Sequence, residues 1–324
     1  MAKQRLPKLA ELGGSAARNV LFFHHGGLGD FVLTWPLLLG AARVLAQSRV
    51  IAVVGEDRGK LAEQVLRVEY RDVEAGWSGL FGNAKLADRP AKLLSKASHV
   101  ISLVAEAGSA WESQVRKHAP EAEVLMLTPP PRGLAGEHAI DHLLGQIAEH
   151  PLLHGGAMGI MESIGRTGLM PRLFDKPGPV VLHVGSGSPA KNWPIAGWID
   201  LANHLRGAGR RVKVIAGEAE RERLSADELA SLGEVSDVQT PRDLSELLFL
   251  LRGAGLFIGH DTGPTHLAAM CGLPTHALFG PKSDPQAFGP VGPRVQVQHV
   301  EDLEALTVDA VVASLAELEG DGPE

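Results

Sequence analysis

The chain has 324 residues, of which 44% are hydrophobic and 21% charged, so it has the composition of a folded protein long enough for two domains. The formal net charge of −7 argues against general nucleic-acid binding, which needs a surplus of lysine and arginine. The single cysteine, Cys271, cannot form an internal disulfide and favours a reducing, cytoplasmic setting.

The beginning of the chain, MAKQRLPKLAELGG, is basic but lacks the apolar centre of a signal peptide. No apolar stretch reaches the roughly 18 residues that predict a membrane span. Lys3, Arg5 and Lys8 could touch an anionic membrane surface, so peripheral contact with the inner face of the cytoplasmic membrane is one expectation. A plain disordered tail is the simpler interpretation.

In the first half, short apolar runs predict buried strands at residues 19–25, 49–55, 99–105 and 123–129. Stretches of helical length separate them, such as residues 31–46 and 136–150. The segment from Gly165 to Pro179 is rich in glycine, proline and charge, which favours a linker over a helix or strand.

The second half repeats this alternation. Strands are predicted at residues 179–185, 210–217, 256–261 and 275–280, and helices at residues 194–209, 218–233 and 243–255. Continuous apolar strands alternating with helices are typical of doubly wound α/β domains, in which helices cover both faces of a parallel sheet. We therefore predict two Rossmann-like domains, residues 18–165 and 179–324, the second ending in a helix at about Val308 to Leu318.

In open α/β sheets, ligands bind beyond the carboxyl ends of the strands, so the loops that follow strands are the candidates for a site. The first is HHGGLGD, residues 24–30. Its glycines, Gly26, Gly27 and Gly29, allow a ligand to approach the backbone closely, and Asp30 closes the loop. An acidic helix cap is the alternative role for Asp30, and the two roles are compatible. The spacing lacks the full GxGxxG pattern, so NAD is a weak fit and we expect no cofactor.

The second loop is GSGSPAKNWP, residues 185–194. Glycine and serine supply backbone and hydroxyl donors, Lys191 adds a positive charge, and a helix follows. Donors, a cation and a helix N-terminus together favour an anion, most simply a phosphate. The alternative is a solvent-exposed lysine on a flexible turn.

The third loop is HDTGPTH, residues 260–266, directly before an apolar helix. The first N–H groups of that helix again favour an anion. In the alternative interpretation, Asp261 or Thr262 caps the helix and His266 is a packed side chain. The two histidines and Asp261 could suggest a metal, but no further ligand pair has supporting spacing, so we predict none.

Two further loops are weaker candidates. In AGEAERER, residues 216–223, either Glu218 or Glu220 is placed to hold ribose hydroxyls, although a charged helix face explains them equally well. The loop FGPKSDPQAFGP, with Asp284 at its centre, either covers a ligand or only turns the chain.

These loops in this order resemble glycosyltransferase family 9, which contains the lipopolysaccharide heptosyltransferases. The resemblance extends from about Asn19 to about Pro290 and is carried by LGDFVLTWP, HVGSGSPAKNWP and FIGHDTGPTHLAAMCGLPTHALFGP. It implies a GT-B fold, with two Rossmann-like domains facing a central cleft. It also implies a cytoplasmic, inverting, metal-independent enzyme that transfers a heptose from an ADP-activated donor. The implied acceptor is a lipopolysaccharide core or a similar, lipid-linked saccharide.

The same resemblance implies roles for individual residues. Asp30 matches the catalytic base, and its loop, with His24, Gly27 and Gly29, lies on the acceptor side. The residues that match donor-binding positions are Ser186, Lys191, Glu220, Asp261, Thr262, Gly263 and His266.

The sequence departs from the family pattern at two places. His24 stands where members often carry an arginine, and Val184 replaces a common proline. The acceptor is therefore left open. The alternatives are a GT-B transferase for another nucleotide sugar, a non-catalytic relative that binds a nucleotide or saccharide, and, third, an oxidoreductase.

Overall fold

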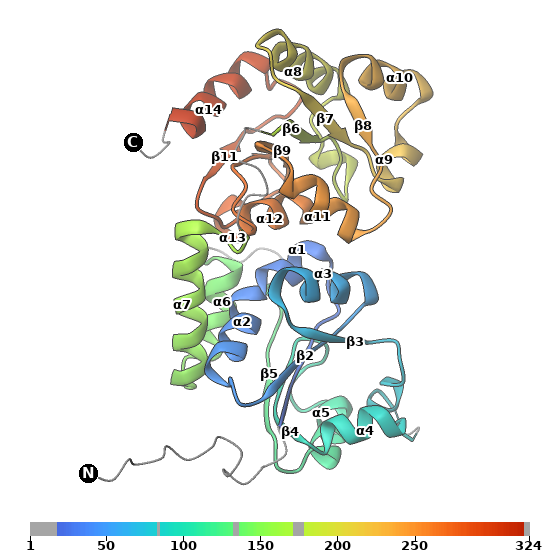
Figure 1. Cartoon of the computed structure of the whole chain (residues 1–324), viewed down its shortest axis with the longest axis vertical. Coiled ribbons are helices and arrows are strands. Elements are labelled where there is room, and N and C mark those ends of the chain that lie inside the picture. The colour runs from blue at the N-terminus through green and yellow to red at the C-terminus, as the bar shows by residue number, and fades with distance from the viewer. Residues whose placement is uncertain (1–17, 83–84, 132–135, 171–177, 321–324) are drawn as a thin grey trace, which may run out of the picture.

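The computed structural model describes residues 18–82, 85–131, 136–170 and 178–320. Within them the strands form two parallel sheets, one from each half of the chain, and helices surround both sheets (Figure 1). The basic residues Lys3, Arg5 and Lys8 lie outside the described residues. No helix in the described part is both long enough and apolar enough to cross a membrane.

The first sheet has the strand order β3-β2-β1-β4-β5. Its strands are β1 (Asn19–Phe23), β2 (Arg49–Val54), β3 (Glu69–Asp72), β4 (Ala97–Ser102) and β5 (Glu123–Met126). Around it lie α1 (Leu28–Leu33), α2 (Trp35–Val44), α3 (Glu56–Leu66), α4 (Asp88–Leu94), α5 (Ala110–His118), α6 (Ala139–Gly145) and α7 (Pro151–Thr167), with a short 3₁₀ turn at Ser78–Leu80. The central strand β1, NVLFF, is buried along its whole length, as expected for a strand covered on both faces.

The second sheet has the order β11-β10-β9-β6-β7-β8. Its strands are β6 (Val180–His183), β7 (Val212–Ile215), β8 (Asp237–Gln239), β9 (Leu256–His260), β10 (Thr275–Phe279) and β11 (Val295–His299). The helices of this half are α8 (Ile195–Gly207), α9 (Glu218–Arg223), α10 (Ala226–Val235), α11 (Leu244–Arg252), α12 (Gly263–Met270), α13 (Pro285–Phe288) and α14 (Val308–Gly320), with a 3₁₀ turn at Pro189–Lys191. In both sheets the order reverses beside the first strand, which is the doubly wound arrangement that the sequence predicted.

Three strands escaped prediction: β3, β8 and β11. Each lies at an edge of its sheet, where one side of the strand has no neighbour. None of their residues is fully buried, so the sequences EYRD, DVQ and VQVQH lack the continuous apolar run of a central strand.

Three predicted segments differ in detail from the structure. The helix predicted at residues 218–233 is two helices, because the Ser225 hydroxyl accepts a hydrogen bond from the Glu228 N–H and starts α10. The helix predicted at residues 31–46 is interrupted at Thr34. Of residues 136–150, only 139–145 form α6.

The predicted linker begins later than expected, because α7 continues to Thr167. Residues 171–177 of this segment lie outside the described residues. The domain boundaries at 165 and 179 therefore stay a prediction. The final helix α14 is confirmed.

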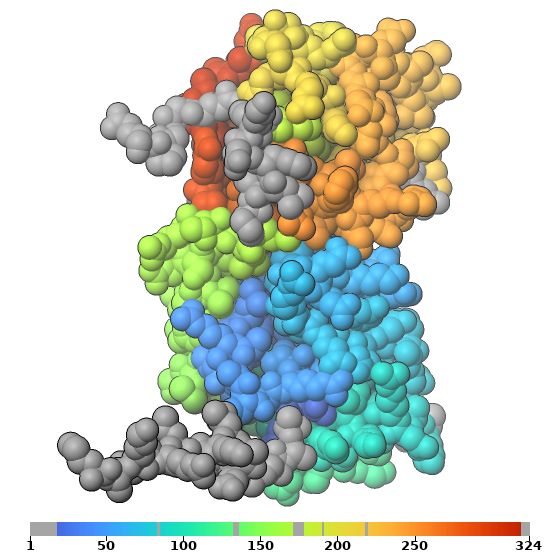
Figure 2. Space-filling model, viewed as in Figure 1, coloured from blue at the N-terminus to red at the C-terminus, as the bar shows by residue number. Residues whose placement is uncertain are grey.

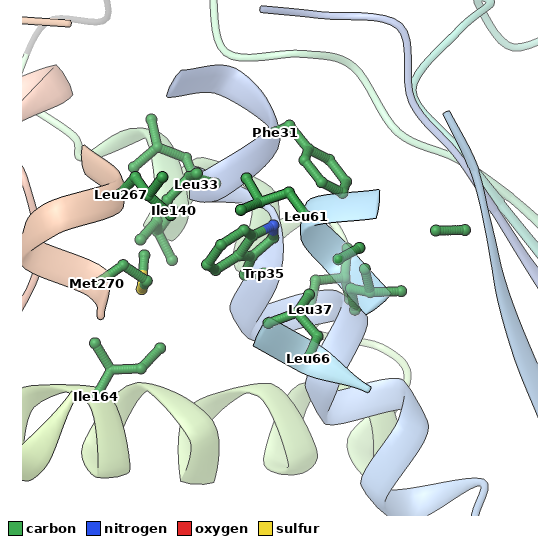
Figure 3. Packing of buried hydrophobic residues seen from close by; sticks show 14 of the residues in the cluster. Phe31, Leu33, Trp35, Leu37, Leu61, Leu66, Ile140, Ile164, Leu267 and Met270 are labelled. Carbon is green, nitrogen blue, oxygen red and sulfur yellow. The ribbon is translucent and has the colours of Figure 1, made fainter. Parts of the chain in front are cut away.

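The two halves share part of one hydrophobic core. Leu267 and Met270 on α12 belong to the same buried cluster as Leu33 and Trp35 of the first half, and Ile164 on α7 joins them (Figure 3). The chain after α7 also follows α12, because the Leu169 N–H donates a hydrogen bond to the Met270 carbonyl over 2.9 Å. Figure 2 shows the two halves in contact, with α7 in light green beside the boundary. This packing places the loops after β1, β6 and β9 near one another.

Candidate active site

The three glycine-containing loops that the sequence singled out lie beside the points where the strand order reverses. HHGGLGD follows β1, GSGSPAKNWP follows β6, and HDTGPTH follows β9. In the second sheet β6 and β9 are neighbours, so the last two loops leave adjacent strands at the same edge. Such a reversal opens a space between neighbouring loops and is where doubly wound sheets bind ligands.

In the first loop, Asp30 is the third residue of α1, and its Oδ2 accepts a hydrogen bond from the Gly27 N–H over 3.1 Å. The side chain is exposed. Asp30 therefore caps the helix, as one interpretation predicted, and still presents a carboxylate to solvent. Gly26 is required here, because a Cβ on it would lie 2.8 Å from His24 Cε1 and 2.9 Å from Asp30 Cβ.

His24 is buried beneath this loop, and its Nδ1 accepts a hydrogen bond from the Gly26 N–H over 3.2 Å. Burial, with a smaller contribution from the nearby Arg58 guanidinium, lowers the pKa of His24 to about 3, so the ring is neutral at physiological pH. His24 therefore shapes the loop and supplies no positive charge to it.

The first loop touches the third loop across the boundary between the two halves. A Cβ on Gly29 would lie 3.1 Å from His266 Cδ2, and a Cβ on Gly263 would lie 2.7 Å from Leu28 Cβ. At Gly263 a Cβ would collide with Leu28, and at Gly29 it would press against the His266 ring, so glycine at both positions allows α1 and the beginning of α12 to approach closely. The acidic loop of the first half and the helix N-terminus of the second half are therefore direct neighbours.

Lys191, Asp261 and His266 form one charged cluster at this edge of the second sheet. The Lys191 Nζ donates a hydrogen bond to Asp261 Oδ2 over 2.9 Å, and His266 Nε2 lies 3.6 Å from Asp261 Oδ1. The Asp261 side chain is 13% exposed. Burial by itself would raise the pKa of Asp261, but the interactions with His266 and Lys191 lower it to about 2, so the carboxylate is ionised at neutral pH.

His260 joins the second loop to the third from below. Its Nε2 accepts a hydrogen bond from the Trp193 N–H over 2.7 Å, and its Nδ1 lies 3.3 Å from the Gly185 carbonyl oxygen, to which it donates. Burial lowers the pKa of His260 to about 3, so the neutral ring can accept on one side and donate on the other. One side chain thus fixes both ends of the loop that carries Lys191.

Thr262 and Glu220 connect to the same region through His183. The Thr262 hydroxyl lies 3.3 Å from His183 Nδ1 and 3.1 Å from the Thr265 hydroxyl. Burial lowers the pKa of His183, while the charge of Glu220 acts in the opposite direction. Glu220 Oε2 accepts a hydrogen bond from the Gly217 N–H over 3.0 Å, so this acid caps α9.

The Ser186 hydroxyl bonds within its own loop, where its oxygen lies 2.6 Å from Asn192 Oδ1 and 2.7 Å from the Ser188 carbonyl oxygen and its single O–H is shared between these two acceptors. Its carbonyl oxygen accepts a hydrogen bond from Arg223 Nη1 over 2.7 Å. The structure thus brings Ser186, Lys191, Asp261, Thr262, Gly263 and His266 into one group of connected loops, with Glu220 below Gly185 and the Asp30 loop opposite.

Two of the weaker predictions have simple outcomes. The Asp284 Oδ1 accepts hydrogen bonds from the Gln286 and Ala287 N–H groups, so Asp284 caps α13. Glu218 begins α9, but its side chain lies outside the described part of the structure.

Sequence analysis missed the role of His183, considered His260 only as a possible metal ligand, and missed Arg223 as part of this region. A histidine at the end of a buried strand was the available signal for the first two, since a neutral histidine can bond two loops at once. For Arg223 no local signal separates it from the other charges of α9. In the part of the chain that the structure describes, no group of three His, Cys, Asp or Glu side chains could hold a metal ion.

Two doubly wound domains whose carboxyl edges face each other define the GT-B class of glycosyltransferase fold, and the predicted fold class is confirmed. Residues 161–310 match the family model described as glycosyltransferase family 9 (heptosyltransferase). The resemblance predicted from the motifs is therefore confirmed over this part of the chain.

Among curated proteins, the chain is similar to lipopolysaccharide heptosyltransferase 1 of Pseudomonas aeruginosa, with 37% identity over 155 residues, which cover 45% of this chain and 41% of the relative. The corresponding enzyme of Salmonella typhimurium is 34% identical over 116 residues, or 36% of each chain. The matched segment thus spans about two fifths of the length of these relatives.

The solved structures match over nearly the whole chain. A family 9 glycosyltransferase from Veillonella parvula has a TM-score of 0.69 at 18% identity and covers 94% of this chain and 98% of its own. The E. coli heptosyltransferase WaaC with ADP has a TM-score of 0.65 at 20% identity and covers 93% of this chain and 99% of its own. At these identities the likeness concerns the fold.

Proposed function

We propose that this protein is an inverting glycosyltransferase that moves a heptose from an ADP-activated donor to a hydroxyl of a lipopolysaccharide core or a similar saccharide. One observation carries the proposal: the loop with Asp30 is in direct contact with the N-terminus of α12, beside the cluster of Lys191, Asp261 and His266. The match to a heptosyltransferase family and the ADP named in the WaaC structure support the choice of donor.

On the donor side, the residues are suited to a sugar diphosphate. The N-terminus of α12 offers the Gly263 N–H and the positive end of a helix dipole to a phosphate, since Pro264 has no N–H and those of Thr265 and His266 donate to the Thr262 carbonyl. Lys191 adds N–H donors to the same place, while Asp261 can accept hydrogen bonds from sugar hydroxyls. Glu220 is the acid that we assign to the ribose, once the donor competes with the Gly217 N–H for its carboxylate.

On the acceptor side, Asp30 supplies the base. Its Oδ2 is held by the Gly27 N–H, and among the described residues its Oδ1 has no hydrogen-bond partner. The carboxylate takes the proton from the acceptor hydroxyl, whose oxygen forms the new bond to the anomeric carbon of the donor. The bond from that carbon to the diphosphate oxygen breaks on the opposite face, and ADP leaves with the electron pair. A single displacement of this kind inverts the anomeric centre.

Positive charge and N–H donors that face the departing diphosphate stabilise it, so the reaction as proposed requires no metal ion and no cofactor. We place the enzyme in the cytoplasm, at the inner face of the membrane where a lipid-linked acceptor is presented. Chelation with EDTA should leave the rate unchanged, and a loss of activity that Mg²⁺ restores would contradict metal independence.

The test combines nucleotide binding with turnover. Calorimetric titration with ADP, UDP, GDP and NAD should show ADP bound at least about tenfold more tightly than the others, which corresponds to about 1.4 kcal/mol. The Asp30→Asn variant should bind ADP normally but transfer sugar about 10²- to 10⁴-fold more slowly, because the base is lost. Asp57→Asn, an exposed carboxylate in the first turn of α3, is the matched control and should keep wild-type turnover.

Each other result selects a different function. A preference for UDP or GDP would keep the transferase and reject the heptose donor. Binding of nucleotide with normal turnover in Asp30→Asn would reject Asp30 as the base. Absence of any nucleoside diphosphate binding would favour the non-catalytic relative, and tight binding of NAD would favour the oxidoreductase.

A further inference from the structure

The cation that the sequence placed at the donor phosphates is already paired. Lys191 Nζ lies 2.9 Å from Asp261 Oδ2, and the lowered pKa of Asp261 keeps that carboxylate ionised. Lys191 and Asp261 together therefore bring hydrogen-bonding groups but no net charge to the site. A diphosphate carries more than one negative charge, so its recognition calls for another cation nearby.

Arg223, the last residue of α9, meets this requirement. Its side chain is exposed, and its Nη1 donates a hydrogen bond to the Ser186 carbonyl over 2.7 Å. Within the described residues, no carboxylate lies within ion-pair distance of Arg223, and its one hydrogen bond leaves its charge uncompensated. A guanidinium has five N–H donors in a planar fork, so four remain available for a ligand.

The position of Ser186 places this guanidinium at the junction of the donor loops. The residue before it, Gly185, is bonded through its carbonyl to His260, at the end of β9. Asp261 and Thr262 come directly after His260 in the chain. Arg223 is therefore bonded to Ser186, the residue next to Gly185. Gly185 is the point where the loop that carries Lys191 is bonded to the loop before α12.

The helix that carries Arg223 is itself fixed against this loop. Glu220, one turn earlier on α9, packs so closely below Gly185 that a Cβ there would lie 2.1 Å from Glu220 Oε1. Glu220 also caps the beginning of α9 through the Gly217 N–H. Glu220 packs against Gly185 and Arg223 is bonded to Ser186, so α9 is held against two consecutive residues of the loop. Arg223 therefore has a defined position relative to this loop.

We propose that Arg223 is a diphosphate-binding residue that supplies the uncompensated positive charge of the donor site, through the guanidinium N–H groups that Ser186 leaves free. The inference rests on the proposed function, because it takes a nucleoside diphosphate as the ligand. It adds a residue to the donor site that neither the motifs nor the comparisons assign.

The experiment measures the affinity of the full-length protein for ADP, AMP and adenosine over a range of salt concentrations. Arg223→Gln should weaken ADP binding about five- to tenfold, weaken AMP less and leave adenosine unchanged, because a charged donor to the β-phosphate is lost. The variant should also show a smaller dependence of ADP affinity on salt, since one screened charge interaction has been removed.

Two further variants separate charge from structure. Arg221→Gln removes an exposed arginine from the same helix two residues earlier and should bind ADP like the wild type. Arg223→Lys keeps the charge but not the planar fork, so it should restore most of the salt dependence.

Unchanged ADP affinity in Arg223→Gln would overturn the inference while leaving the transferase intact. An equal loss for ADP, AMP and adenosine, with the salt dependence of the wild type, would also overturn it, because that pattern is expected if Arg223 only holds the Ser186 carbonyl. If the wild-type protein binds no nucleoside diphosphate, the proposed function itself is wrong and the role of Arg223 falls with it.

Discussion

Replacing Asp261 with asparagine should destabilise the second half of the protein in a pH-dependent way. The pKa of Asp261 falls from an ordinary 3.8 to about 2 in the folded protein. At 1.36 kcal/mol per pH unit this depression corresponds to roughly 2 kcal/mol of stability at neutral pH. The side chain is only 13% exposed, so solvent screening reduces this value little.

The sign follows from the direction of the pKa. Because the folded protein holds the proton of Asp261 more weakly than the unfolded chain does, the stabilisation is complete above about pH 5 and disappears as the pH falls toward 2. About half of it should remain at pH 3. Asp261→Asn keeps the shape of the side chain but has no charge, so its deficit relative to the wild type should shrink over this range.

The measurement is the free energy of unfolding in urea at pH 7, 4 and 3, followed by hydrogen exchange in peptides from β9 and α12. Exchange in these peptides reports the local unit directly, which matters because a chain with two domains need not unfold in one step. Asp200→Asn, an exposed carboxylate on α8, is the control and should show no comparable deficit. A deficit of the same size at pH 7 and pH 3 would refute the ion-pair argument.

Two further predictions concern packing. Gly156→Ala should destabilise the protein by about 1–3 kcal/mol, because the new Cβ would lie 2.7 Å from Val44 Cγ1 and 2.8 Å from the Gly40 carbonyl oxygen of α2. Gly155→Ala, one residue earlier on α7, meets no atom within 4 Å and should stabilise by about 0.4–1 kcal/mol. Thermal unfolding of the pair measures both, and equal effects would contradict the close approach of α2 and α7. A third prediction concerns the loop that carries Lys191: His260→Leu should weaken ADP binding, because the Trp193 N–H loses its acceptor. His260→Gln should restore part of the affinity, because its amide oxygen can accept the same hydrogen bond. If the glutamine variant binds ADP no better than the leucine variant, this explanation is wrong.

The sequence was sufficient for the fold because most of its strands are buried on both faces. β1 and β9 are fully buried, and a short, continuous apolar run bounded by turn residues predicts such a strand. The edge strand β3 has the sequence EYRD, which carries no comparable pattern. Its formation depends on pairing with β2, which only the tertiary structure supplies.

The candidate site was predictable in its parts and not in its connections. The loops that contain Asp30, Lys191 and Asp261 stand out by composition, since glycine clusters before helices are unusual. That His266 lies against Gly29, or that Arg223 reaches the Ser186 carbonyl, depends on how the two halves and α9 pack. No spacing in the sequence encodes such contacts between distant segments.

The shared core around α12 limits how this protein can be recombined with its relatives. Leu267 and Met270 belong to the second half in sequence but are buried against Leu33, Trp35 and Ile164 (Figure 3). A chimera that joins the first half of one homologue to the second half of another would combine side chains from two different packing solutions at this junction. Exchange of donor specificity between family members should therefore succeed only when α12 and the residues of α1, α2 and α7 that pack around it are transferred together.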